Sequence, residues 1–388
     1  LRKKILWSEY GPVVKNDSGV FSFHLSALEN ISAIDQWYQM NKAKNFEDFK
    51  KALKIMGIPR FNIVYADKED NIFYMSNGLI PLRDTNFNWK LTLPGNTSKT
   101  KTNGYYSFKD LPQLENPISG YIFNTNNSPF NCTKKTYKLE EENFHKNLGY
   151  REKFNNRSLR FEKLIDNYEK IDYEDFLTIK YDQEYANPIF CPFKINKIFE
   201  LSVNDSSEVE DVLSIIQSWN RKANVDNIGA AQFSMFYKNL RKKLKKIKFD
   251  FDSEIPDSLL VESLQKTKSQ ILGSFDNLNI SLGEYQKHVR AEIEIPIGGL
   301  VDMIAESSSS KSKDGMVKIV KGDSYIMLVK FGDELPEIET VLPYGISNDT
   351  KSVHFTDQMN LYATQKRKKM TLDKSEIYKN ASNIYHPK

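Results

Sequence analysis

The sequence predicts an α+β fold in which a helical region interrupts strand-rich regions. Short runs of β-branched and aromatic residues dominate residues 1–124 and return after residue 316, whereas residues 139–245 carry apolar side chains at helical spacing. Strands, then helices, then strands are typical of α+β chains rather than of chains that alternate strand and helix. The length of 388 residues permits one to three domains.

The first expected elements are a short hairpin and two helices. Ile5–Trp7 and Val13–Val14 flank a Tyr-Gly-Pro turn and should pair. Ser32–Met40 places apolar residues at helical spacing, which predicts a helix. A second helix should begin after Asn45, because an asparagine side chain can accept a hydrogen bond from the first turn. It should end at Gly57–Pro59.

A second hairpin is predicted next. Phe61–Tyr65 and Ile72–Met75 are β-rich runs on either side of the polar stretch Asp67–Asn71. The acidic residues of this stretch lack the glycine and the bidentate glutamate of a calcium loop, so a turn is the better interpretation. After a polar, irregular connection over residues 86–105, we expect a further strand at Gly120–Asn124.

The middle of the chain is predicted to be helical and its end to contain strands again. The apolar residues at helical spacing include Leu159, Phe161, Leu164, Ile165, Trp219, Phe233, Phe236 and Leu240. Ser307–Asp314 has the composition of a low-complexity loop. Strands are expected at Met316–Val320 and Tyr325–Phe331, joined by a hairpin turn at Lys321–Ser324.

The composition is that of a globular protein without a membrane or nucleic-acid partner. Hydrophobic residues make up 39% and charged residues 27% of the chain. No apolar stretch approaches the roughly 20 residues that cross a bilayer. The net charge of +4 is small, and the basic runs Lys242–Lys248 and Lys366–Lys369 are typical of solvated helix faces. No nucleic-acid-binding motif accompanies these runs.

The sequence contains no self-contained catalytic or metal-binding motif. It lacks a GxSxG elbow, an HExxH pair and a phosphate-binding glycine-rich loop. The five histidines are scattered, and a paired-carboxylate site stays open because acidic residues are numerous. Cys132 and Cys191 could form one disulfide or remain free thiols.

Five segments, in order along the chain, resemble stretches of one enzyme family. They are Trp37–Phe46, Phe61–Asp67 with Asn71–Tyr74, Leu111–Ile122 with Asn124–Pro129, Pro343–Asn348, and His354–Gln358. The Asn-Thr-Asn-Asn-Ser-Pro block is the most specific of them. Together they resemble the penicillin amidase family, which includes penicillin acylases and acyl-homoserine lactone acylases. Within this family the chain is similar to the C-terminal part of the β subunit.

This resemblance implies a particular fold. The family has the four-layer αββα sandwich of N-terminal-nucleophile hydrolases, and we expect the N-terminal part of that fold to be missing from this chain. Residues 1–145 would be the β-rich part of the sandwich and residues 146–285 a mostly helical region. Residues 286–388 would supply returning strands and the C-terminal segment.

The resemblance also implies an amide-bond hydrolase with a serine acyl-enzyme mechanism. In this family a precursor cuts itself, and a serine that becomes the first residue of the β subunit uses its own α-amino group as the base. Leu1 has no such side chain, so we expect the serine in a preceding segment. Substrates would be N-acyl compounds such as acyl-homoserine lactones or penicillins. The alternative is a non-catalytic or truncated relative that binds acylated ligands.

Five residues match positions of the family's active site. Asn126 matches the asparagine whose side-chain amide donates to the oxyanion, and Arg157 matches an arginine held near the active site. Trp37 and Phe61 match acyl-pocket positions, and Asn62 a residue that bonds backbone near the reaction centre. From the residues alone, the asparagines could equally form a turn, Arg157 a surface ion pair, and the two aromatics part of the core.

The expected partners follow from the same resemblance. They are an upstream α subunit and the N-terminal β segment of the same precursor, together with a small-molecule N-acyl substrate. The location would be periplasmic or secreted, in a bacterium. The family's calcium ligands have no clear match downstream of Ser128, where Tyr137 and Glu140–Glu142 stand, so we expect no cofactor and leave calcium open.

Overall fold

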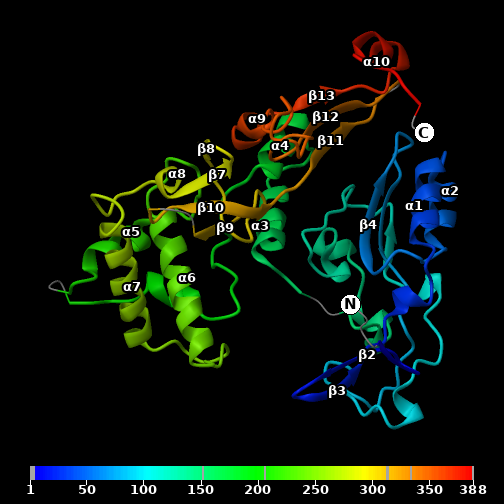
Figure 1. Ribbon diagram of the computed structural model, residues 1–388, viewed down its shortest axis with the longest axis horizontal. Helices are drawn as coiled ribbons and strands as arrows, with labels where there is room; N and C mark the ends of the chain where they lie inside the picture. Colours follow the sequence, from blue (N-terminus) through cyan, green and yellow to red (C-terminus); the bar gives the residue numbers. More distant parts are fainter. Residues whose placement is uncertain (1–4, 151–152, 205–206, 312–313, 333, 387–388) are drawn as a thin grey trace. The chain divides into compact units, whose positions relative to one another are not determined.

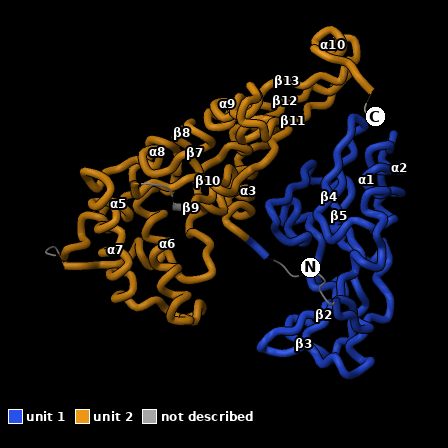
Figure 2. The backbone as a smooth tube through the Cα atoms, viewed as in Figure 1, with its two compact units in different colours: residues 1–154 blue, residues 155–388 orange. Residues whose placement is uncertain are grey.

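The chain forms two compact units, residues 1–154 and residues 155–388, each of which is described by itself (Figure 2). The computed structural model describes residues 5–150, 153–204, 207–311, 314–332 and 334–386. Both units contain helices and strands, and their sheets are small, with three or four strands each. The expected order of strands, helices and strands is therefore confirmed. The division into regions 1–145, 146–285 and 286–388 stays a prediction.

Unit 1 contains two antiparallel sheets of three strands (Figure 1). The first has the order β1 (Leu6–Ser8), β2 (Gly11–Asn16) and β3 (Gly19–Ser22). The second has the order β4 (Phe61–Ala66), β5 (Ile72–Asn77) and β6 (Gln113–Glu115). Both hairpins that the sequence predicted for the first 80 residues are therefore confirmed.

The β4–β5 hairpin fixes which side chains share a face of its sheet. Phe61 lies opposite Asn77 and Asn62 opposite Ser76 in the antiparallel register. Because side chains alternate along a strand, Asn62 and Ser76 share one face and Phe61 lies on the other. In the turn, the Asp67 carboxylate accepts the backbone N–H groups of residues 69 and 71 at 2.9 and 3.0 Å. The acidic stretch thus forms a turn, as expected.

Two helices, α1 (Ala33–Lys42) and α2 (Phe46–Leu53), cover the Phe61 face of this sheet. The Asn45 side chain accepts the N–H of residue 48 at 2.9 Å, which confirms the expected helix cap. Phe46 and Leu53 pack against strand residues such as Ile63 and Phe73 in the core of unit 1. The helix pair therefore gives the sheet a rigid support on one side.

A buried polar network also holds α1 against the sheet. The Gln36 side chain is fully buried, donates to Asn77 Oδ1 at 2.9 Å and accepts the Ile58 N–H at 2.9 Å. Asn77 Nδ2 donates in turn to the Leu53 carbonyl at 2.9 Å. Because Gln36 faces inward, the next residue on the helix, Trp37, is left 46% exposed.

The remainder of unit 1 is irregular and contains several short 3-10 helices. They are η1 (Ser26–Leu28), η2 (Ser98–Thr100), η3 (Phe108–Asp110), η4 (Pro129–Asn131), η5 (Lys135–Tyr137), η6 (Glu141–Asn143) and η7 (Lys146–Leu148). The prediction of a strand at Gly120–Asn124 is wrong. Phe123 N–H donates to the Cys132 carbonyl at 2.8 Å, but no ladder forms around this bond. The segment is tied to a neighbouring loop instead of a sheet.

The helical part of unit 2 packs around one large apolar core. Its helices are α3 (Asn156–Ile165), α4 (Tyr173–Lys180), η8 (Ile195–Phe199), α5 (Glu210–Ser218), α6 (Ala230–Lys246), α7 (Asp257–Leu272) and α8 (Leu282–Tyr285). Trp219, Phe233, Phe236 and Leu240 are all buried in that core, as their spacing predicted. In Figure 1, α6 and α7 run side by side below the strands.

Two sheets complete unit 2. One has the order β8 (Ile293–Pro296), β7 (Gln286–Arg290), β10 (Val317–Gly322) and β9 (Ser307–Lys311). The other has the order β11 (Ile326–Lys330), β12 (Glu337–Val341) and β13 (Lys368–Met370). The helices α9 (Met359–Ala363) and α10 (Lys374–Asn380) lie near the end of the chain.

Two sequence predictions fail in these sheets. Ser307–Lys311 is a strand and not a loop, because it pairs along β10 and gains ladder hydrogen bonds that its serine composition does not announce. The strands β10 and β11 exist, but they belong to different sheets and do not form a hairpin. Hydrogen bonding to partners distant in sequence decided both outcomes.

Candidate active site

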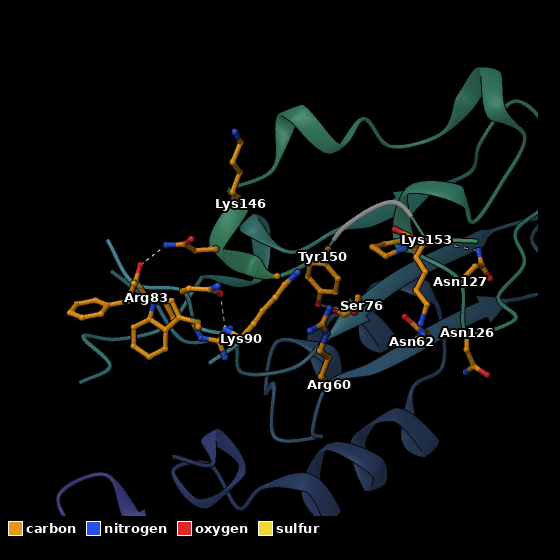
Figure 3. A pocket seen from close by; sticks show the side chains of 17 residues that line it. Arg60, Asn62, Ser76, Arg83, Lys90, Asn126, Asn127, Lys146, Tyr150 and Lys153 are labelled. Carbon is orange, nitrogen blue, oxygen red and sulfur yellow. Dashed lines mark hydrogen bonds between the residues drawn. The ribbon is translucent and has the colours of Figure 1, made fainter. Parts of the chain in front are cut away.

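The asparagine-rich segment of unit 1 borders a cavity of about 590 Å³. Five stretches of the chain contribute to its wall, which Figure 3 shows from close by. The lining residues are Arg60, Asn62, Ser76, Arg83, Phe87, Asn88, Trp89, Lys90, Asn126, Asn127, Ser128, Pro129, Lys146, Asn147, Gly149, Tyr150 and Lys153. The cavity has the size of a small-molecule site.

Asn126 lies at this cavity with an exposed side chain on a constrained backbone. Its φ is +64°, in the left-handed region that asparagine tolerates better than most residues. Its backbone N–H donates to Asn124 Oδ1 at 3.1 Å, and the same oxygen accepts Asn62 Nδ2 at 3.3 Å. Asn62 Oδ1 in turn accepts the Tyr74 hydroxyl at 2.7 Å. A chain of side-chain hydrogen bonds thus links the Asn126 turn to the sheet.

Asn127 has the opposite environment and a structural role. Its side chain is 5% exposed. The Oδ1 atom accepts the N–H of Thr125 at 2.7 Å, and Nδ2 donates to the Asn131 carbonyl at 2.7 Å. In Figure 3 the side chains of Asn126 and Asn127 leave the loop on opposite sides. Asn127 therefore closes the turn, while Asn126 presents its amide outward.

The loop that follows is fastened to the segment at residue 153. Ser128 N–H and Asn131 Nδ2 both donate to the Lys153 carbonyl, at 3.2 and 3.4 Å. The Ser128 side chain also accepts the N–H of Phe130 at 3.2 Å, at the start of η4. These contacts bring Lys153 to the wall of the cavity.

The cavity wall is strongly basic. Its described lining includes five cationic side chains and no aspartate or glutamate, and the cationic residues are Arg60, Arg83, Lys90, Lys146 and Lys153. The Arg60 guanidinium lies 3.9 Å from the centre of the Tyr150 ring, and that of Arg83 lies 5.6 Å from the Trp89 ring. Burial lowers the pKa of Arg83 from its ordinary value, and the positive charge of Arg60 lowers it further.

The structure brings only some of the predicted site residues to this cavity. Asn126 and Asn62 line it. Trp37 and Phe61 do not: Phe61 is on the helix-covered face of the sheet and is 51% exposed, and Trp37 is on the outer side of α1. Both aromatics are therefore surface-exposed in unit 1. Their role in an acyl pocket stays a prediction.

Arg157 belongs to unit 2, where α3 positions it. Its Nε donates to Asp302 Oδ1 at 3.0 Å, and both side chains are partly exposed. Asp302 Oδ2 also accepts the Asn156 backbone N–H at 2.9 Å, so the carboxylate caps the first turn of the helix. This ion pair orients the guanidinium, and its role near a reaction centre stays a prediction.

Sequence reasoning missed the basic residues of the cavity. Arg60 could have been found, because strand alternation places it on the same face as Asn62. Arg83, Lys90 and Lys146 come from irregular segments, and no local pattern indicates that these segments meet.

The described parts of both units contain no group of three or more His, Cys, Asp or Glu side chains that could hold a metal ion. Cys132 and Cys191 are free thiols, and burial raises the pKa of Cys132 to about 12 and that of Cys191 to about 11. Among the helices described, none combines the length and the apolar character that crossing a bilayer requires.

Comparison with sequence families gives one match over nearly the whole chain. The family model described as penicillin amidase matches residues 2–379. An acyl-homoserine lactone acylase PvdQ from Pseudomonas savastanoi is 22% identical over 419 residues, covering 95% of this chain and 53% of the relative. The PvdQ acylase of Pseudomonas putida is also 22% identical, over 94% of this chain and 52% of its own length. This chain therefore spans about half the length of these relatives.

A local match and a solved structure point the same way. Penicillin G acylase from Escherichia coli is 36% identical over 106 residues, which cover 26% of this chain and 12% of that enzyme. The structure of a thermostable penicillin G acylase from Alcaligenes faecalis superposes with a TM-score of 0.61 at 15% identity. This match covers 99% of this chain and 79% of that one. It shows the fold, and it confirms the expected α+β fold of the N-terminal-nucleophile hydrolase type.

Proposed function

Because this chain belongs to the penicillin amidase family, we propose that it forms the oxyanion-binding part of an acylase, an enzyme that hydrolyses a linear amide bond. The attacking group is a serine hydroxyl, an acyl-enzyme forms, and water then releases the acid. In this proposal the serine is the first residue of a processed β subunit and lies outside the segment described. Its own α-amino group serves as the base, since a chain-terminal amine titrates near neutral pH.

The geometry of Asn126 carries the proposal. Its side chain is exposed at a cavity of small-molecule size, on a turn that Asn124, Asn62 and Asn127 hold with hydrogen bonds. A neutral amide is a suited oxyanion donor, because it needs no change of protonation as negative charge develops on the substrate oxygen. A rigid turn adds to the effect, because a donor already in place needs no reorganisation during the reaction.

The remaining candidate residues have proposed positioning and binding roles. Arg157, oriented by Asp302, is proposed to help hold the active-site segments in register. Trp37 and Phe61 are proposed to contact the acyl group in the complete protein, and their exposure in this chain is compatible with that role. Asn62 is proposed to position the oxyanion turn through its bond to Asn124.

The proposed setting follows from the family. The partners are an α subunit and the N-terminal β segment of one self-cleaving precursor, and the substrate is an N-acyl compound. Similar proteins are found in Pseudomonas species, and we propose a bacterial periplasmic or exported location. No cofactor is proposed, because serine acyl transfer with an amide oxyanion donor needs none.

The test uses the complete processed protein and a panel of N-acyl amides with different acyl lengths. We expect release of free amine and a transient mass increase equal to one acyl group on the subunit that holds the serine. Asn126→Asp keeps the size and the tolerance for positive φ, but replaces the donor with a negative charge. It should lower kcat by at least about 10²–10³. Binding without amine release would support a non-catalytic relative. Full activity of the aspartate variant would show that Asn126 is not the donor.

A further inference from the structure

The cavity beside Asn126 is a concentration of unpaired positive charge. None of its five cationic side chains forms an ion pair within the part of the chain that the structure describes. The whole sequence carries a net charge of only +4, so this concentration is local and does not reflect a generally basic protein. Cations gathered in a concave site repel one another, and an anion in the same space relieves that repulsion.

Arg60 and Arg83 are the best-placed members of this group. Each guanidinium lies against an aromatic ring, that of Tyr150 or Trp89, which restricts its orientation. The backbone at Arg83 is fixed as well, because Asn147 Nδ2 donates to its carbonyl at 2.6 Å. The charge of Arg60 is near enough to lower the pKa of Arg83. Two like charges thus line one cavity whose described wall contains no carboxylate.

We propose that this cavity binds the amine half of the substrate, and that this half carries a dianionic oxyacid group held between Arg60 and Arg83. The inference rests on the proposed acylase function and specifies its substrate class. A phosphate monoester and a dicarboxylate share the relevant chemistry, because both offer two negative charges and several acceptor oxygens to planar guanidinium groups. Lys90, Lys146 and Lys153 also line the cavity and add further positive charge to its wall.

The amine half fits this cavity better than the acyl half. An apolar acyl chain would have to displace water from charged side chains. It would gain few apolar contacts in return, because guanidinium groups already lie over the rings of Tyr150 and Trp89. A nucleic acid is also disfavoured, because a cavity of about 590 Å³ has room for a small group and not for an extended backbone. A small anionic head group satisfies both the charge and the volume.

The test compares three amides with one common acyl group in the complete protein. They are N-acyl-O-phosphoethanolamine, N-acyl-aspartate and the neutral N-acyl-ethanolamine. We expect kcat/KM to be higher for at least one anionic amide than for the neutral amide. The anionic amide with the higher kcat/KM identifies the preferred head group. Arg60→Gln and Arg83→Gln should each lower kcat/KM for the preferred anion by about 10- to 100-fold. They should lower kcat/KM for the neutral amide by a clearly smaller factor than for the preferred anion.

Matched controls separate charge from folding. Lys68→Gln removes one positive charge from the β4–β5 turn, at the other end of the strand from Arg60, and should change none of the three rates. Lys90 is exposed, so Lys90→Gln should fold normally and still lower the anionic preference by a smaller factor. Melting temperatures of all variants should be measured alongside the rates.

Binding of simple anions can be measured separately from amide hydrolysis, so the anion site and the acylase function can be tested independently. Inorganic phosphate and malonate should bind the parent in calorimetry and bind more weakly to Arg60→Gln, whether or not any amide is hydrolysed. If the protein binds these anions through Arg60 but hydrolyses none of the amides, the acylase function is refuted and the anion site is retained. The inference is overturned if kcat/KM is equal for the three amides, or if neither anion binds. It is also overturned if the anions bind equally well after either arginine is replaced.

Discussion

The backbone conformation of Asn126 allows its proposed role to be tested with two substitutions that delete the same amide. Asn126 has a φ of +64°. Alanine in this left-handed region costs about 1–2 kcal/mol, whereas glycine adopts it without a steric penalty. If the amide donates to the oxyanion, Asn126→Ala and Asn126→Gly should both lower kcat by about 10²–10³. KM should change less in both, because the donor acts on charge that develops in the transition state.

The comparison between the two variants separates chemistry from backbone strain. Only the alanine variant should lose stability, by an amount that a denaturant titration of the complete protein resolves. Single-turnover kinetics with a chromogenic N-acyl amide would measure the chemical step directly. If Asn126→Gly keeps full activity while Asn126→Ala loses both activity and stability, the residue serves as a turn former and the oxyanion assignment is wrong.

Three further predictions concern a buried asparagine, an exposed tryptophan and a partly buried lysine. Asn127→Ala should destabilise the fold by about 1–3 kcal/mol, because it removes the side-chain hydrogen bonds to the N–H of Thr125 and to the carbonyl of Asn131. An unchanged midpoint of denaturant unfolding would contradict this prediction. Trp37→Ala should shift the complete enzyme's substrate preference toward bulkier acyl groups. The shift should be gradual, because one methylene in an apolar pocket changes the binding free energy by only about 1–3 kcal/mol. If the variant and the parent show the same dependence of rate on acyl-chain length, Trp37 has no role in acyl binding. Burial lowers the pKa of Lys238 to about 8, so the folded state binds fewer protons than the unfolded state between about pH 8 and 10.5 and gains stability as the pH rises through that window. Lys238→Met should therefore be more stable than the parent at pH 7 by up to about 3 kcal/mol and should lose most of that advantage above pH 10. A stability difference that does not change with pH would refute the lowered pKa of Lys238.

Local sequence patterns predicted those elements whose stabilising contacts are themselves local. The β4–β5 hairpin follows from alternating β-formers around a turn, and Asp67 closes that turn with bonds to residues two and four positions ahead. The start of α2 follows from Asn45, which caps a backbone N–H three residues away. The helical core of unit 2 follows from the spacing of apolar residues such as Phe233 and Phe236.

The sequence by itself also determined the family resemblance and the position of the asparagine turn, because both lie in contiguous motifs. Only the tertiary structure decided which asparagine is buried, that Ser307–Lys311 is a strand, and that Asn62 lines the cavity whereas Phe61 does not. It alone gathered Arg60, Arg83 and their neighbours into one basic wall. The physical reason is that these features depend on hydrogen bonds and packing between segments far apart in the chain, which no local spacing encodes.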